Sequence, residues 1–203
     1  MSLHVIGYTS EYVFIAADKR VSNSADLSFV DDEAVKVYKV KDNIYFDAGC
    51  AMSHNEAAIK VIESYKHLPA TQLIEVVRKL DRRFKTIHGD HITSMYLTGF
   101  DENNNFFMWI GLPGSNEEEL ICNVPNNGFG WQIFGMTDGK SYGNEKQINT
   151  IVEVDRYLKS RLSSQFDRRE LIQDCITYGA LIDKVVSPTY DTWYFNRNNL
   201  KLN

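Results

Sequence analysis

The spacing of the apolar residues changes along the chain. Near the N-terminus they form short β-branched and aromatic runs, which predict two strand hairpins, residues 3–8 with 12–17 and residues 35–40 with 43–48. Residues 23–33, between the hairpins, are polar and predict a loop. This part of the chain is therefore expected to contribute four antiparallel strands.

A helical period then replaces these short runs. Residues 53–56 have the capping-box pattern of a helix start, and the apolar spacing behind them predicts a helix that runs to about Lys66. Pro69 ends this helix, and a second one with the same period is expected to end near His88. Two helices with so short a connection should lie side by side on one face of a sheet.

The second half of the chain repeats this order. Its predicted elements are four strands, two helices and a last strand, at residues 93–100, 105–111, 120–124, 131–136, 144–162, 167–182 and 192–195. The last strand could pair with residues 199–202. Strand blocks that alternate with helix pairs predict an α+β fold, a four-layer α-β-β-α sandwich of two antiparallel sheets flanked by helix pairs. Residues 1–203 are expected to form a single domain.

Composition narrows the function classes. A formal net charge of −5 without a basic run argues against nucleic-acid binding. No stretch reaches the roughly 18 apolar residues of a membrane span, and the N-terminus has no secretory-signal pattern, so a cytoplasmic protein is expected. The three cysteines have no metal or disulfide spacing, and the His88 to His91 segment is interpreted as a solvated turn. No metal or cofactor is therefore expected.

Three polar residues stand at the ends of predicted strands: the hydroxyl of Ser2, the carboxylate of Asp18 and the ammonium of Lys36. If the strands pair, the three groups could converge at one edge of a sheet. A cation lowers the pKa of its neighbours and a carboxylate orients the cation, which is what a hydroxyl nucleophile needs. Asp18 and Lys36 could equally be a structural ion pair, and both interpretations are open at this point.

Several short sequence motifs, taken in their order along the chain, resemble those of the proteasome β-subunit family of N-terminal-nucleophile (Ntn) hydrolases. Bacterial relatives of that family include the peptidase ring of a two-component ATP-dependent protease. The similarity covers nearly the whole chain and is carried by FIAADKRVS at 14–22, VKVYKV at 35–40, FDAG at 46–49, HITSMYLTGFD at 91–101 and IFGMTDGKSYG at 133–143. It implies the four-layer fold and a peptidase or amidohydrolase activity.

The resemblance also implies a role for each matching residue. Ser2, sixteen positions before Asp18, occupies the nucleophile position, where the free α-amine of the same residue acts as general base. Lys36 would stabilise the alkoxide-like charge, and Asp18 would hold Lys36. The backbone N–H of Gly49 would face the oxyanion of the tetrahedral intermediate.

Asp183 and Ser187 occupy the positions of a supporting aspartate and serine, with one residue more between them than the family shows. Two positions depart from the family: Ser2 stands where a threonine is usual, and Met136 stands where a serine is usual. A retained Met1 would make the nitrogen of Ser2 an amide, which is no base. Removal of Met1 would free it, and a leader left by expression would make Ser2 foreign to the chain.

Two functions are consistent with these observations. One is a hydrolase that acts through an N-terminal nucleophile on a peptide or amide substrate. The other is a catalytically inactive proteasome-like subunit that serves as an assembly or binding module. Both predict a homo-oligomer, a ring or a dimer, with a possible ATPase partner and with neither nucleic acid nor membrane as partner.

Overall fold

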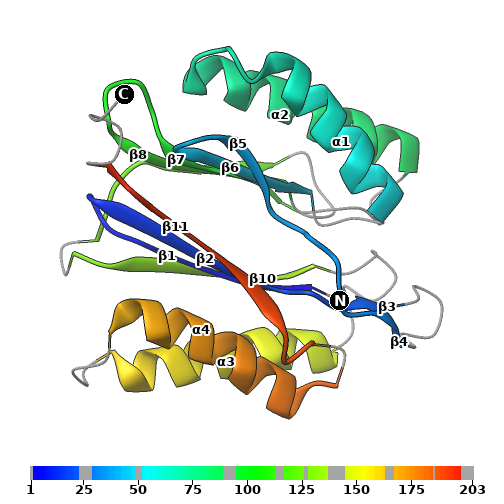
Figure 1. Ribbon diagram of the computed structural model, residues 1–203, viewed down its shortest axis with the longest axis vertical. Helices are drawn as coiled ribbons and strands as arrows, with labels where there is room; N and C mark the ends of the chain where they lie inside the picture. Colours follow the sequence, from blue (N-terminus) through cyan, green and yellow to red (C-terminus); the bar gives the residue numbers. More distant parts are fainter. Residues whose placement is uncertain are drawn as a thin grey trace.

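The structure, a computed structural model, describes residues 2–22, 29–48, 52–88, 95–112, 117–125, 128–136, 145–162, 167–184 and 186–197. Two antiparallel sheets pack face to face between two helix pairs (Figure 1). The predicted four-layer α-β-β-α sandwich is confirmed.

The first sheet carries the start of the chain. Its strand order is β10-β1-β2-β11, with β1 Ser2–Tyr8, β2 Tyr12–Asp18, β10 Gly130–Met136 and β11 Tyr190–Asn196. Successive side chains of a strand point to opposite faces. Leu3 and Val5 accordingly pack toward the helices, whereas Ile6 packs into the core between the sheets. The last strand is longer than the predicted residues 192–195.

The second sheet has the order β5-β6-β7-β8-β9. Its strands are β5 Tyr38–Lys41, β6 Ile44–Ala48, β7 Met95–Phe100, β8 Phe106–Gly111 and β9 Glu118–Ile121. The predicted hairpin between β7 and β8 is confirmed. Its turn is built by Asp101, whose side chain accepts the backbone N–H groups of Asn103 and Asn105, with Asn104 in the left-handed region at φ 61°.

Two strand predictions for the first half were wrong in detail. Residues 35–37 are not in a strand, because the side-chain amide of Asn55 donates to the carbonyl of Lys36 at 3.4 Å, where a neighbouring strand would otherwise bond. The predicted loop 23–33 contains β4, Phe29–Asp31, which pairs with β3, Val21–Ser22. Lys36 therefore lies just before β5 instead of within it.

Helices α1, Met52–Tyr65, and α2, Ala70–His88, cover the second sheet, and α3, Glu145–Arg161, and α4, Arg168–Ile182, cover the first (Figure 1). The start of α4 is capped by Asp167, whose side chain accepts the N–H of Arg169 at 2.8 Å. Helix α1 begins before the predicted cap at Ser53. All four predicted helices are present.

Glycine lets α4 approach β1 closely. A Cβ at Gly179 would lie 2.4 Å from Cδ2 of Leu3, so a larger residue there would displace the side chain of Leu3. Among the described residues, no helix combines the length and the apolar character needed to cross a membrane.

Candidate active site

Asp18, the last residue of β2, is the centre of the site. Its side chain is fully buried and accepts four hydrogen bonds. Oδ1 accepts the N–H of Leu3 at 2.6 Å and Nζ of Lys36 at 3.0 Å. Oδ2 accepts the N–H of Arg20 at 3.1 Å and that of Ser187 at 3.2 Å. One carboxylate thus joins the start of β1, the lysine and the segment after α4.

Lys36 is the cation of the site and is itself buried, with 6% of its surface exposed. Burial lowers the pKa of its ammonium group, while the charges of Asp18, Asp47 and Asp32 act in the opposite direction. The ion pair with Asp18 compensates the charge that burial disfavours. Lys36 is therefore a cation fixed in a weakly solvated place, suited to stabilising negative charge beside it.

The candidate nucleophile lies next to this carboxylate along the chain. Ser2 opens β1 opposite Met136 of β10 and directly precedes Leu3, whose N–H bonds Asp18. The side chains of Ser2 and Met136, and Gly49 as a whole, lie outside the described part of the structure. The nucleophilic hydroxyl and the oxyanion donor therefore stay predictions.

The two predicted supporting residues have different surroundings. Ser187 is buried and contacts Asp18 through its backbone, while its hydroxyl lies 2.7 Å from that of Thr189. Asp183 caps the C-terminus of α4 and accepts the hydroxyl of Thr150 at 2.9 Å, which ties α4 to α3. The structure thus brings Ser187 to the central carboxylate and shows Asp183 in a contact between helices.

Arg20 is a residue of this region that the sequence analysis missed. Its guanidinium donates to both oxygens of Asp32, each at 2.9 Å, and to the carbonyls of Lys184 and Val186. The hydrogen bond with Asp32 is the main reason why its pKa is raised. Val186 precedes Ser187, whose N–H bonds Asp18. The hydrogen bond from Arg20 to the carbonyl of Val186 therefore holds this segment in place. The acidic partner lies in the predicted loop, where no periodic pattern points to it.

A cluster of three polar side chains, also not predicted from the sequence, lies between the two sheets. His4, Asp47 and Tyr96 are all buried, and Nδ1 of His4 lies 3.1 Å from the hydroxyl of Tyr96. Burial and then the charge of Lys36 lower the pKa of His4 well below its usual value, so the ring is neutral. The sign of this cluster in the sequence is that each of the three strands has a polar residue at a position that faces the other sheet.

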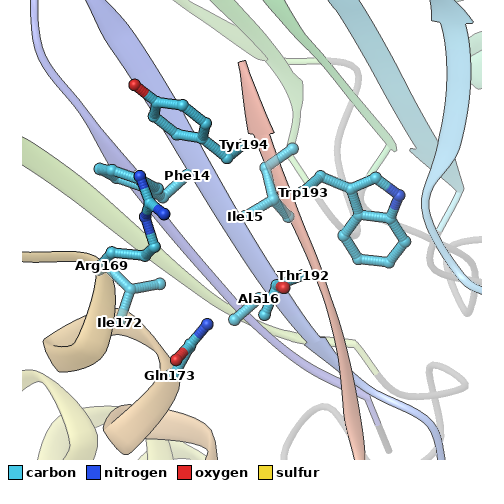
Figure 2. A pocket seen from close by; sticks show the side chains of 9 residues that line it. All are labelled: Phe14, Ile15, Ala16, Arg169, Ile172, Gln173, Thr192, Trp193 and Tyr194. Atoms are coloured by element: carbon cyan, nitrogen blue, oxygen red, sulfur yellow. The ribbon is translucent and has the colours of Figure 1, made fainter. Parts of the chain in front are cut away.

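A small pocket lies on the other face of the first sheet, against α4 (Figure 2). Its lining residues are Phe14, Ile15, Ala16, Arg169, Ile172, Gln173, Thr192, Trp193 and Tyr194. The guanidinium of Arg169 lies over the rings of Phe14, at 5.3 Å, and Tyr194, at 4.4 Å. The volume of about 20 Å³ holds about one water molecule, so this pocket is no substrate site.

The comparisons with known proteins agree with the architecture. No protein-family model matches the chain, and no curated protein matches it in sequence. The crystal structure of eukaryotic HslV from Trypanosoma brucei is similar, with a TM-score of 0.62 over 96% of this chain and 99% of that one. The two sequences are 10% identical, so the likeness concerns the fold. This chain therefore has an HslV-like α-β-β-α sandwich fold.

Proposed function

We propose that the protein is a proteasome-type Ntn hydrolase, a peptidase or amidohydrolase that acts through Ser2. The observation that carries the proposal is the pair of hydrogen bonds on Oδ1 of Asp18, one from the N–H of Leu3 and one from Lys36. They bring a buried ammonium group to the start of β1, where Ser2 lies. The HslV-like fold supports the same assignment.

In this mechanism Met1 has been removed and the α-amine of Ser2 is free. The amine accepts the proton of the hydroxyl while the oxygen attacks the carbonyl carbon of an amide. The C–N bond then breaks, the proton goes to the leaving amine, and water hydrolyses the ester that remains. The reference pKa of an α-amine, roughly 7.7–8.0, suits a base that works near neutral pH.

Residues of this chain stabilise the charges of that step. The ammonium of Lys36 faces the developing charge on the oxygen of Ser2, and Asp18 keeps the ammonium in place. The N–H of Gly49 donates to the oxyanion, a contribution of about 3–4 kcal/mol for one such donor. The roles of Ser187 and Asp183 are to support the carboxylate and the end of α4.

The proposal includes self-association into a ring or dimer, an ATPase partner and a cytoplasmic location. These features rest on the resemblance of the sequence motifs to the proteasome β-subunit family. Light scattering of the purified chain tests the oligomer. An assembled but inactive protein would favour the second candidate function, an assembly or binding module.

The test of activity compares three chains whose N-termini are defined by intact mass. Wild type without Met1 is expected to hydrolyse members of a panel of fluorogenic peptidyl amides. Ser2→Ala should lose at least about 1000-fold in kcat, as expected for loss of a nucleophile. Ser10→Ala, at an exposed turn, should keep the wild-type rate. Turnover that survives in Ser2→Ala would overturn the proposal.

A further inference from the structure

The main chain around Lys36 lies outside the two sheets. Residues 33–37 form neither strand nor helix, although Lys36 carries the buried ammonium group of the candidate site. On one side of it, the N–H of Ala34 donates to the carbonyl of Lys19 at 3.2 Å. On the other side, Val37 is buried in the core between the sheets. Because this segment belongs to no strand, individual contacts determine where the main chain of Lys36 lies.

Asn55 supplies one of these contacts from helix α1. It is the fourth residue of that helix and is 3% exposed. Its side-chain nitrogen Nδ2 donates to the carbonyl of Lys36 at 3.4 Å. A carbonyl oxygen only accepts hydrogen bonds, so the amide has to turn its nitrogen, and not its oxygen, toward Lys36. This hydrogen bond joins α1 to the residue that carries the cation.

The oxygen of the same amide has no such contact. Oδ1 of Asn55 is buried and has no hydrogen-bond partner among the residues that the structure describes. A leucine at this position would remove the unsatisfied oxygen, but it would also take a donor away from the carbonyl of Lys36. These two effects on stability oppose each other. The amide therefore contributes little to stability, and its specific consequence is the place where it holds Lys36.

The position of this main chain determines where the ammonium group can reach. Nζ of Lys36 donates to Oδ1 of Asp18 at 3.0 Å, at the end of a flexible four-carbon side chain. A functional group that is displaced by about 1 Å can lose most of its effect on a reaction. Asn55 is neutral, so it acts on Lys36 through position and not through charge.

We propose that Asn55 is a positioning residue of the site, whose side-chain amide holds the main chain of Lys36 so that the ammonium group meets Asp18. Its effect on catalysis rests on the proposed function. Its effect on Lys36 does not, because it is a property of the folded chain.

Two variants remove the donor and differ in size. Asn55→Leu has nearly the volume of the wild-type side chain, and Asn55→Ala is too small to push on its neighbours. Each should lower kcat about 10–100-fold, as displacement of a functional group does, with little change in KM. Asn149→Leu, at an exposed position of helix α3, is the matched control and should keep the wild-type rate.

A second readout requires no turnover. Lys36 and Lys85 are both 6% exposed, and Lys85 pairs with Asp81 of the same helix, α2, at 2.5 Å. Brief acetylation of the folded chain, mapped by mass spectrometry, should label both lysines slowly in wild type. In the two Asn55 variants Lys36 should be labelled about tenfold faster, the change expected in an opening equilibrium that one hydrogen bond controls. Lys85 should not change, so it is an internal control for unfolding.

The outcomes separate the two proposals. If wild type hydrolyses nothing but Lys36 is labelled faster in both Asn55 variants, the proposed function fails and the positioning role of Asn55 stands. If Lys36 and Lys85 are labelled faster together, Asn55 supports the whole fold and the inference is overturned. Unchanged labelling of Lys36, or a change in Asn55→Leu that is absent in Asn55→Ala, also overturns it.

Discussion

The backbone N–H of Leu3 donates to Oδ1 of Asp18 at 2.6 Å, and the ammonium of Lys36 donates to the same oxygen at 3.0 Å. A single atom at the end of β2 thus fixes both the beginning of β1 and the buried cation. The first contact is made by the main chain, so it depends on the carboxylate and on no other side chain. Asp18 is therefore the residue whose loss should affect the site most broadly.

Asp18→Asn should destabilise the fold strongly. The substitution removes the charge that pairs with buried Lys36 and places an N–H₂ group where two of the four donors now bond. Loss of one partner of a buried ion pair lowers the free energy of unfolding by about 3–5 kcal/mol. Urea unfolding at pH 7 measures this change. The control is Asp42→Asn, which removes an exposed pair with Lys39 and should have no measurable effect. Equal midpoints for the two variants would contradict the role of Asp18.

His4 should make stability depend on pH below neutrality. Its pKa in the folded state is well below 6.5, so the unfolded chain binds a proton there that the folded chain does not. Stability is therefore lost as pH falls below 6.5, by up to about 1.4 kcal/mol per pH unit until the folded pKa is reached. His4→Phe lacks this loss.

The measurement is urea unfolding of both chains at pH 7 and pH 5. The difference in stability between wild type and His4→Phe should change by about 2 kcal/mol in favour of the variant on going to pH 5. His67→Phe, at an exposed position, should follow wild type at both values. A pH-independent difference between wild type and His4→Phe would contradict this prediction, because it would mean that the pKa of His4 is the same in the folded and the unfolded chain.

Arg20→Lys should loosen the segment after α4. Lysine keeps the charge but cannot contact both oxygens of Asp32 and the two carbonyls at once. The side chain is partly exposed, so global stability should fall by less than about 1 kcal/mol. The N–H of Ser187, which bonds Asp18, should exchange faster with deuterium. Arg78→Lys, on α2, is the control. Unchanged exchange at Ser187 in Arg20→Lys would contradict the claim that Arg20 holds the segment after α4 in place.

Thr150→Val should weaken the contact between α3 and α4. It keeps the volume of the side chain and removes the hydroxyl that donates to the buried carboxylate of Asp183 at 2.9 Å. A buried acceptor that loses its donor costs about 1–3 kcal/mol. Thr150→Ser, which retains the hydroxyl, should lose less than Thr150→Val in thermal unfolding. The reverse order would mean that the methyl group matters more than the hydrogen bond.

Local patterns in the sequence were sufficient to predict the layers. The helical period predicts all four helices, and short β-branched and aromatic runs between turns predict the strands of both sheets, because these signals depend on neighbours in the chain. The run from Val35 to Val40 predicts a strand that contains Lys36, because it is rich in β-branched and aromatic residues. Asn55, from the following helix, bonds its carbonyl instead, and nothing in that short run shows this.

The site could be predicted only in part, for a similar reason. Ser2, Asp18 and Lys36 are predictable because each stands at the end of a predicted strand. Arg20 and Asp32 are paired across two short strands, and His4 meets Tyr96 from the opposite sheet. Contacts between residues so far apart in the chain produce no periodic pattern in the sequence. A polar residue at an inward position of a strand, as at His4, is the one sign that the sequence contained.

The most direct test of the central claim is covalent labelling of the N-terminus. Protein shown by intact mass to lack Met1 is treated with a lactone probe, and the labelled peptide is mapped by mass spectrometry. We expect one acyl group per chain on the peptide that begins with Ser2, absent in Ser2→Ala and present in Ser10→Ala. An unlabelled Ser2 in the Met1-free chain, or a label that persists in Ser2→Ala, would contradict it.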